Sequence, residues 1–184
     1  MENKEKVIKL AHLIVTVVGL ALYVISLLQY GSNINRIVFI SILVNIVALV
    51  LGLIYLAMSY KKNAASFYKA FMWILVISEV IESVSISSTF TPTVADIFRI
   101  NINLVLFTLI AGAKDYGKKN SYLLALCLVV FNVYTVLNVL PTAGNFNIDA
   151  NLVIFDRIGQ LMLAILASLM VCGKYIDKDA RGTN

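Results

Sequence analysis

The sequence has few of the residues that most catalytic and metal sites require. It holds one histidine, His12, and two cysteines, Cys127 and Cys172. A single histidine excludes paired-histidine haem ligation and a multi-histidine zinc site within the chain. There is no Gly-x-Ser-x-Gly elbow or phosphate-binding loop, and no base is placed to activate a serine or cysteine. We therefore expect a protein that is not an enzyme and that carries neither a cofactor nor a bound metal.

Charged residues are also scarce, at 14% of the chain, whereas 60% of the residues are hydrophobic. Soluble domains are about a quarter charged and close to half apolar, so a soluble fold could not bury this excess. A bilayer accepts apolar surface without penalty. The formal net charge of +5 comes from short basic clusters between apolar runs. This pattern predicts membrane topology, with the lipid bilayer rather than nucleic acid as the partner.

Six apolar runs each approach the roughly 20 residues that a spanning helix needs. The first follows a basic N-terminus, but it is too long for a signal peptide and no small-x-small cleavage site follows it. We predict an all-α polytopic membrane protein with a single transmembrane domain over residues 1–184, of which 173–184 form a short charged cytoplasmic tail. The predicted helices cover about 8–28, 37–58, 67–86, 97–113, 122–140 and 152–172.

The lysines predict how these helices are oriented. All eleven lie at the N-terminus, in or beside alternate connections, or in the C-terminal tail, positions that share one side when there are six spans. The positive-inside rule makes that side cytoplasmic. Tyr60, Tyr68, Tyr116, Tyr122 and Tyr175 lie at the same boundary, which amphipathic rings prefer. We therefore expect both termini in the cytoplasm and a multi-pass location in a bacterial inner membrane.

The outer side has no lysine, and its cations are Arg36, Arg99 and Arg157. Each is followed by isoleucine near the start of an even-numbered helix, and successive arginines are about 60 residues apart. The spacing predicts three sequential helical hairpins, and such repeats often build a site where they meet. The alternative is convergence, since any outward-facing helix can begin with an arginine that reaches the headgroups.

Two carboxylates in the third predicted helix are the most informative residues. Glu79 and Glu82 are three residues apart and therefore share a helix face. Arg99 is expected at the depth of Glu82, so an ion pair between them is the simplest arrangement. Glu79 lies deeper, without an obvious partner, within possible reach of asparagines or of another hairpin's arginine. The candidate ligand-binding or ion-pairing residues are Glu79, Glu82, Arg99, Asn103, Asn132 and Arg157.

Polar residues gather in the outer halves of the predicted spans, whereas the cytoplasmic halves are almost entirely apolar. Because buried polar groups face each other or water, this asymmetry predicts a polar pocket open to the outside and closed on the cytoplasmic side. The alternative is a set of interhelical hydrogen bonds. An intramembrane carboxylate such as Glu79 can carry a proton, bind a cation or hold a cationic ligand. Its spacing from Glu82 also suits a hard metal ion, but that spacing is common in helices.

We predict solute recognition or transport across the cytoplasmic membrane, with a small molecule or ion taken from the outer side. In size, span number and topology the chain is similar to the substrate-binding subunits of energy-coupling-factor vitamin transporters. Its nearest small residues to their helix-one Ala-x-x-x-Ala motif are Gly19 and Ala21. One alternative is a non-transport membrane partner (a scaffold, immunity protein or accessory subunit, or a homo-oligomer), for which Ala164 and Ser168 offer a small-residue contact face. The other is a triggered ion channel with an acidic outer vestibule.

Overall fold

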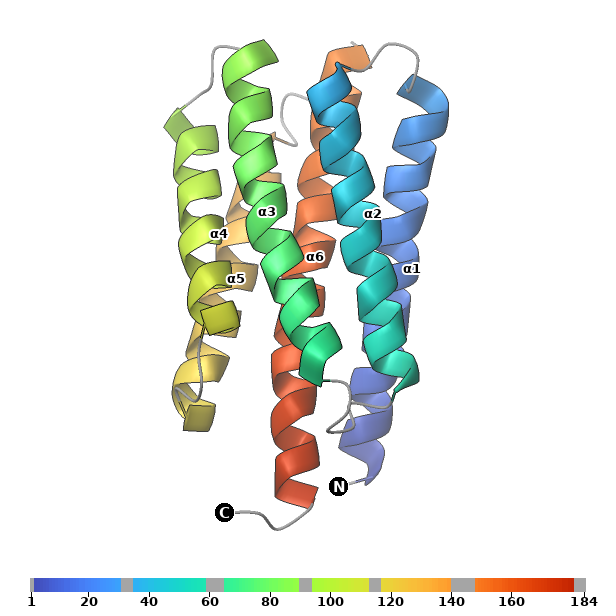
Figure 1. The fold of residues 1–184 in the computed structure, drawn as a ribbon, viewed down its shortest axis with the longest axis vertical. Coiled ribbons are helices and arrows are strands. Elements are labelled where there is room, and N and C mark those ends of the chain that lie inside the picture. Colours follow the sequence, from blue (N-terminus) through green and yellow to red (C-terminus); the bar gives the residue numbers. More distant parts are fainter. Residues whose placement is uncertain are drawn as a thin grey trace.

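The computed structural model of the chain describes residues 2–30, 35–58, 65–89, 94–112, 117–139 and 148–180. These residues form six α-helices and contain no strand. Figure 1 shows the helices side by side in one elongated bundle. We call the end where α1 begins and α6 ends the base, and the opposite end the top. The helices are α1 (Glu2–Tyr30), α2 (Arg36–Ala57), α3 (Ala65–Thr89), α4 (Val94–Gly112), α5 (Gly117–Val139) and α6 (Ile148–Ala180).

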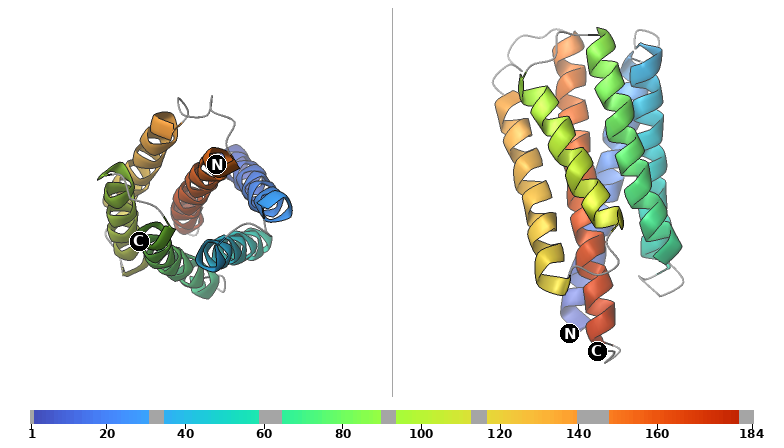
Figure 2. Two further views of the ribbon diagram at one scale, coloured as in Figure 1. Left: turned by 90° about the horizontal axis from the view of Figure 1, so that it is seen from above. Right: turned by 60° about the vertical axis from the view of Figure 1, so that its left-hand side comes forward.

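Helix α6 is the most enclosed element of the bundle (Figure 2). It packs against α1 and α5 and also contacts α2, while each of the other helices packs against its neighbours in the sequence. Small residues permit this close approach: Gly159 lies against Tyr23 of α1, and Ala164 and Ala167 are fully buried. The position of α6 therefore lets its side chains meet those of several other helices.

The outside of the bundle is apolar, which is the reverse of a soluble helical bundle. On α3, the exposed side chains include Trp73, Ile77 and Val80, and α1, α2, α4 and α5 present similar faces. Among the described side chains, the strongly exposed large apolar residues lie on α1–α5 and none belongs to α6. Four segments are long and apolar enough to cross a membrane, namely Glu5–Gln29, Arg36–Ala57, Lys118–Asn138 and Ile154–Tyr175. These features indicate an α-helical membrane protein.

Within the side chains that the structure describes, the other two helices do not reach the length and composition of a membrane span. Helix α3 carries three charged residues, Lys69, Glu79 and Glu82, within its apolar stretch. The apolar part of α4, Ile97–Gly112, is shorter than the four candidate spans. Six helices are thus shown, and four of them qualify as spans by length and composition.

Each predicted helix overlaps an observed one, but α1 begins six residues and α5 five residues before the predicted start, and the largest difference is at the end of α6. That helix does not end at Cys172 but continues through the buried Gly173 to Ala180. Helix α5 holds this extension, because Tyr175 packs edge-on against Tyr122 at 5.7 Å and its Oη lies 2.8 Å from Ser121 Oγ. Residues 173–180 are therefore helical, while 181–184 lie outside the described residues, as do Tyr60 and Tyr116 of the predicted boundary.

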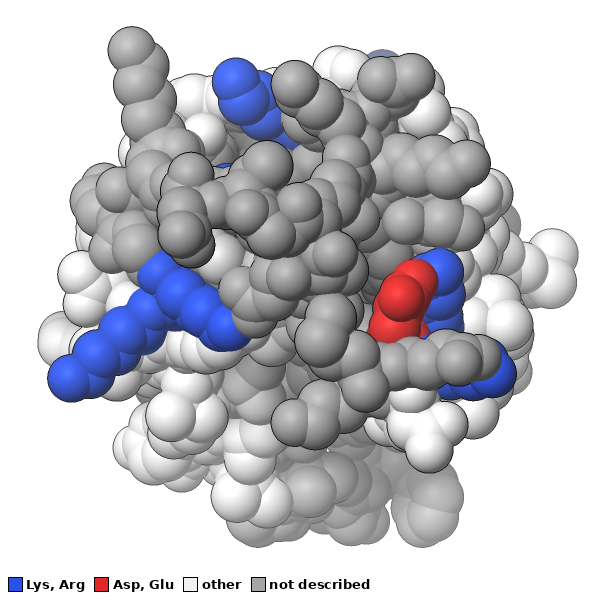
Figure 3. Space-filling view, turned by 90° about the horizontal axis from the view of Figure 1, so that it is seen from below, with Lys and Arg blue, Asp and Glu red and all other residues white. Residues whose placement is uncertain are grey.

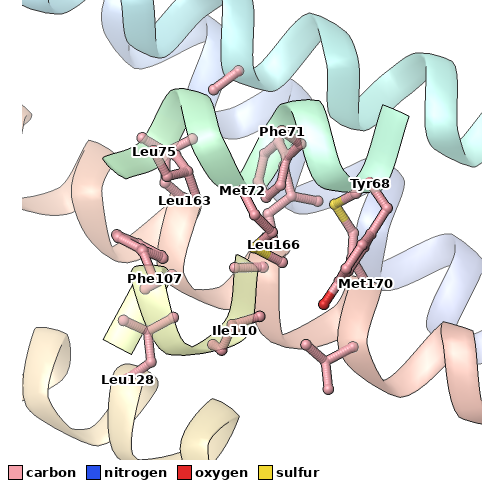
Figure 4. Close-up of a cluster of buried hydrophobic side chains, with 14 of the residues drawn as sticks. Tyr68, Phe71, Met72, Leu75, Phe107, Ile110, Leu128, Leu163, Leu166 and Met170 are labelled. Carbon is pink, nitrogen blue, oxygen red and sulfur yellow. The ribbon is translucent and has the colours of Figure 1, made fainter. Parts of the chain in front are cut away.

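Large apolar side chains fill the bundle on the base side of its centre (Figure 4). Phe71, Met72 and Leu75 of α3 meet side chains of α4, α5 and α6, and all of them are buried. We call this set the apolar layer; its labelled members are Tyr68, Phe71, Met72, Leu75, Phe107, Ile110, Leu128, Leu163, Leu166 and Met170. Apart from the hydroxyl of Tyr68, its side chains are apolar, so the layer separates the interior above it from the base.

His12 occupies a separate place in the same half of the bundle. Its Nε2 lies 2.9 Å from the carbonyl oxygen of Gly52, which ties α1 to α2. An added Cβ at Gly52 would approach Leu166 Cδ2 to 2.8 Å. His12 is therefore a buried polar contact between helices.

Candidate functional site: a buried ionic network

A group of charged and amide side chains meets on the top side of the apolar layer. Each member is at least nine-tenths buried. The members come from four helices, and all six residues singled out in the sequence belong to the group. We call it the ionic network; it consists of Glu79 and Glu82 of α3, Arg99 and Asn103 of α4, Asn132 of α5, and Arg157 and Gln160 of α6.

Glu82 is the centre of the ionic network. Its Oε1 accepts hydrogen bonds from Arg99 Nη2 and from Arg157 Nη1, the latter at 3.0 Å. Its Oε2 accepts a hydrogen bond from Gln160 Nε2 at 3.0 Å. The predicted pairing of Glu82 with Arg99 is present, and α6 adds two further donors. Because both oxygens are satisfied by charged or amide donors, Glu82 is well suited to remain ionised in the interior.

Glu79 has a much poorer set of partners. Its Oε1 accepts a hydrogen bond from Asn103 Nδ2 at 3.0 Å. Its Oε2 has no hydrogen-bond partner among the described residues, and Arg99 Nη1 lies 3.9 Å away, beyond hydrogen-bond distance. The sequence indicates Asn103, Asn132 or an arginine as possible partners of Glu79. The structure provides the first directly and the arginine only at a distance.

Asn132 supports Glu79 indirectly. Its Nδ2 donates to Asn103 Oδ1 at 2.9 Å, and Asn103 Nδ2 lies 3.3 Å from Asn132 Oδ1. Asn132 Nδ2 also donates to the carbonyl oxygen of Leu128 at 2.9 Å. These bonds fix the amide of Asn103 in the orientation that donates to Glu79. Helix α5 therefore acts on Glu79 through Asn103.

Other buried polar atoms around the ionic network also lack hydrogen-bond partners within the described part of the chain. They are Arg99 Nε and Nη1, Asn45 Nδ2, and Tyr23 Oη. Tyr23 belongs to α1, is 1% exposed and lies within electrostatic reach of Glu79, Glu82 and Arg99. An unpaired polar atom in an apolar interior costs roughly 1–3 kcal/mol. Several such atoms at one level of the bundle indicate a region that is not optimised for stability alone.

The charges of this region do not balance. Asp156, beside Arg157 with an Oδ2–Nη1 distance of 3.2 Å, adds a third carboxylate. Three carboxylates, Glu79, Glu82 and Asp156, thus stand against two guanidinium groups. The Asp156 side chain is 31% exposed, so solvent screens part of its charge, whereas Glu79 is almost fully buried. Of the three carboxylates, Glu79 is the most deeply buried and has no charged donor within hydrogen-bond distance.

The three outer arginines do not occupy equivalent places. Arg36 is the first residue of α2 and is exposed, whereas Arg99 and Arg157 lie further inside their helices and point into the ionic network. Since α4 begins at Val94 and α6 at Ile148, each arginine stands at a different distance from its helix start. Arg99 and Arg157 both bond to Glu82, whereas the exposed Arg36 does not, so the arginines mark no contact common to all three predicted hairpins.

Two contributors were not among the candidate residues. Gln160 follows Arg157 by three positions, so it shares that helix face, and this spacing could have identified it. Tyr23 stands in an apolar helix and has no local signal that separates it from a packing residue. Asn101 of α4, by contrast, is exposed and bonds to its own helix at Ile97 O, at 2.7 Å.

Comparison with protein-family models, with curated proteins and with solved structures finds no match. Among the described residues, no three His, Cys, Asp or Glu side chains converge as ligands of a metal ion would.

Proposed function

We propose that the chain crosses the cytoplasmic membrane six times, as three sequential hairpins with both termini in the cytoplasm. Supporting this, α3 and α4 lie within the same bundle as the four candidate spans. Their charged residues Glu79, Glu82 and Arg99 point inward, while their outer faces are apolar. Basic side chains lie at several places on the base, one group of them beside an acidic side chain (Figure 3), and the positive-inside rule assigns this end to the cytoplasm.

We propose further that the protein recognises or transports a small solute or ion that reaches the ionic network from the top. The observation that carries this proposal is Glu79 Oε2, a buried carboxylate oxygen without a hydrogen-bond partner among the described residues. Ionisable groups inside a membrane are costly, and they mark substrate and ion pathways. Along α3, which runs from the base to the top, Phe71, Met72 and Leu75 of the apolar layer precede Glu79, so the top is the more direct approach to the network.

A purely structural role for the network is the main competing explanation. The bonds between Asn103 and Asn132, and the 2.5 Å bond from Ser78 Oγ to Asn45 Oδ1, are typical of polar contacts that join membrane helices. Such contacts do not require a carboxylate with an open oxygen. The structural explanation therefore accounts for the amides but leaves Glu79 without a reason.

A membrane partner would need a surface other than the predicted small-residue face. Ala164 is fully buried, and Ser168 Oγ donates to the carbonyl oxygen of Ala125 on α5 at 3.0 Å. Helix α5 therefore covers this face within the chain. The proposals of a scaffold or an accessory subunit therefore gain no specific support from this face.

Replacement of Glu79 by glutamine tests the proposal. Glutamine keeps an oxygen for Asn103 and removes the charge, so the fold should be retained. The protein and the variant are purified gently from native membranes, and co-eluting small molecules are identified by mass spectrometry. We expect a solute with the unaltered protein and its loss from Glu79→Gln. The matched control is Glu5→Gln, which alters a partly exposed carboxylate paired with Lys9 at 2.6 Å and should leave the solute bound.

An unchanged set of co-purifying molecules, together with reduced stability of Glu79→Gln, would contradict the proposal. In that case Glu79 would be a structural carboxylate, and the conductance of the reconstituted protein would become the next property to measure.

A further inference from the structure

The two buried glutamates differ in how their charge is compensated. Glu82 receives three hydrogen bonds, two of them from guanidinium groups. Glu79 receives one, from an uncharged amide. Arg99 serves both glutamates but is committed to Glu82, since its Nη2 bonds there and its Nη1 remains 3.9 Å from Glu79. A buried carboxylate in this position needs one further positive charge to be stable.

The surroundings of Glu79 suit a proton better than a metal cation. A hard metal ion takes six or more oxygen ligands at short range. Glu79 Oε2 has the guanidinium of Arg99 at 3.9 Å, which would repel a cation bound to the same oxygen. Asn103, the residue that holds the other oxygen, presents an amide donor rather than an acceptor. A proton needs only the one open oxygen.

The titratable and charged groups that face Glu79 come from four elements. They are Tyr23 of α1, Glu82 of α3, Arg99 of α4, and Asp156 with its neighbour Arg157 of α6. Within the described residues, α2 and α5 contribute only the amides of Asn45 and Asn132 at this level. With Glu79 neutral, the remaining two carboxylates and two guanidinium groups balance.

We propose that Glu79 is the proton-binding site of this protein, taking one proton per chain on Oε2 and exchanging it with the outer side. The proton comes from water, and only the O–H bond of the carboxylic acid forms or breaks. Asp156, with its partly exposed side chain, marks where the network approaches the surface. This inference rests on the proposed function, since it makes the proton either the transported ion or the ion coupled to a solute.

Infrared spectroscopy of the full chain in lipid nanodiscs tests the inference directly. At neutral pH, the unaltered protein should show the carbonyl band of a buried carboxylic acid, shifted in heavy water and lost as the pH is raised. Glu79→Gln should lack that band, and Glu5→Gln should keep it. Glu79→Asp provides a second variant that retains an acid, and it should show a displaced band if Glu79→Gln fails to fold.

Three results would overturn the inference. The band could be absent from the unaltered protein at every pH, which would mean that Glu79 stays ionised. It could persist in a folded Glu79→Gln protein, which would assign it to another group. It could disappear on addition of sodium or potassium chloride at constant pH, which would identify a metal cation as the ligand.

Failure of the inference and failure of the proposed function give different patterns. If Glu79→Gln loses the co-purified solute and the unaltered protein shows no acid band, solute recognition is supported and proton binding at Glu79 is refuted. If the acid band is lost in Glu79→Gln while the same solute still co-purifies, proton binding at Glu79 is supported and solute recognition by Glu79 is refuted.

Discussion

Replacing Arg99 by alanine removes the one cation that faces both buried glutamates. Its Nη2 bonds to Glu82, and its Nη1 lies 3.9 Å from Glu79 Oε2. Truncating one partner of a buried ion pair costs about 3–5 kcal/mol, because the other charge stays buried. Glu82 keeps its bonds from Arg157 and Gln160, both at 3.0 Å. We therefore expect the lower end of that range, about 3 kcal/mol, in the free energy of unfolding measured by denaturant titration in mixed micelles.

Adding Glu82→Gln to Arg99→Ala should recover part of this loss, since the carboxylate left without its main cation is then neutral. Arg157 still has Asp156 at 3.2 Å, so no arginine is stranded. We expect an interaction energy of about 0.5–3 kcal/mol between the two substitutions. Arg36→Ala, at the exposed start of α2, is the control and should change stability by less than about 0.5 kcal/mol. Equal stability of Arg99→Ala and Arg36→Ala, or strictly additive losses in the double variant, would refute the buried pair.

Two further substitutions test the packing around the network by the same titration. Gly159→Ala puts a Cβ 2.5 Å from the tyrosine ring of α1 and should cost about 1–3 kcal/mol, while Gly112→Ala, with no atom within 4 Å, should change stability by less than about 1 kcal/mol. Matching stabilities would show that α1 and α6 do not pack this closely. Asn132→Leu leaves Asn103 without its amide partner and should cost about 1–3 kcal/mol. Asn138→Leu is the control. Asn138 is exposed and bonds to Tyr134 O of its own helix, so its replacement should not change stability if the loss in Asn132→Leu comes from a buried amide.

The helices themselves could be predicted, because long apolar runs have few alternatives to helix in a membrane. The pairing of Glu82 with Arg99 was also accessible. A short connection puts the end of one helix and the start of the next at one depth, which brings residues 17 apart into contact. The bonds from Arg157 and Gln160 to the same glutamate could not be predicted from the sequence. They join residues 75 and 78 apart, and they depend on α6 lying between its neighbours, which no local pattern encodes.

Small residues produced the misleading signals in the sequence. Ala164 and Ser168 suit contacts within a chain as well as contacts between chains, and only the packing of α5 against α6 distinguishes the two. Gly173 is a common helix terminator, yet here it is a buried helical residue because Tyr175 beyond it packs against Tyr122. In both cases a tertiary contact, rather than local preference, determines the structure.

Arg99 couples the two glutamates, and through Glu82 this coupling links Glu79 to α6. Whatever charge Glu79 carries acts on Arg99, and Arg99 shares Glu82 Oε1 with Arg157 of α6. Helix α6 continues from that contact through the apolar layer to Tyr175, which bonds to Ser121 near the base. A proton or solute bound at Glu79, as proposed above, would therefore alter the force on α6. Because α6 is continuous from Ile148 to Ala180, it links the ionic network mechanically to the base.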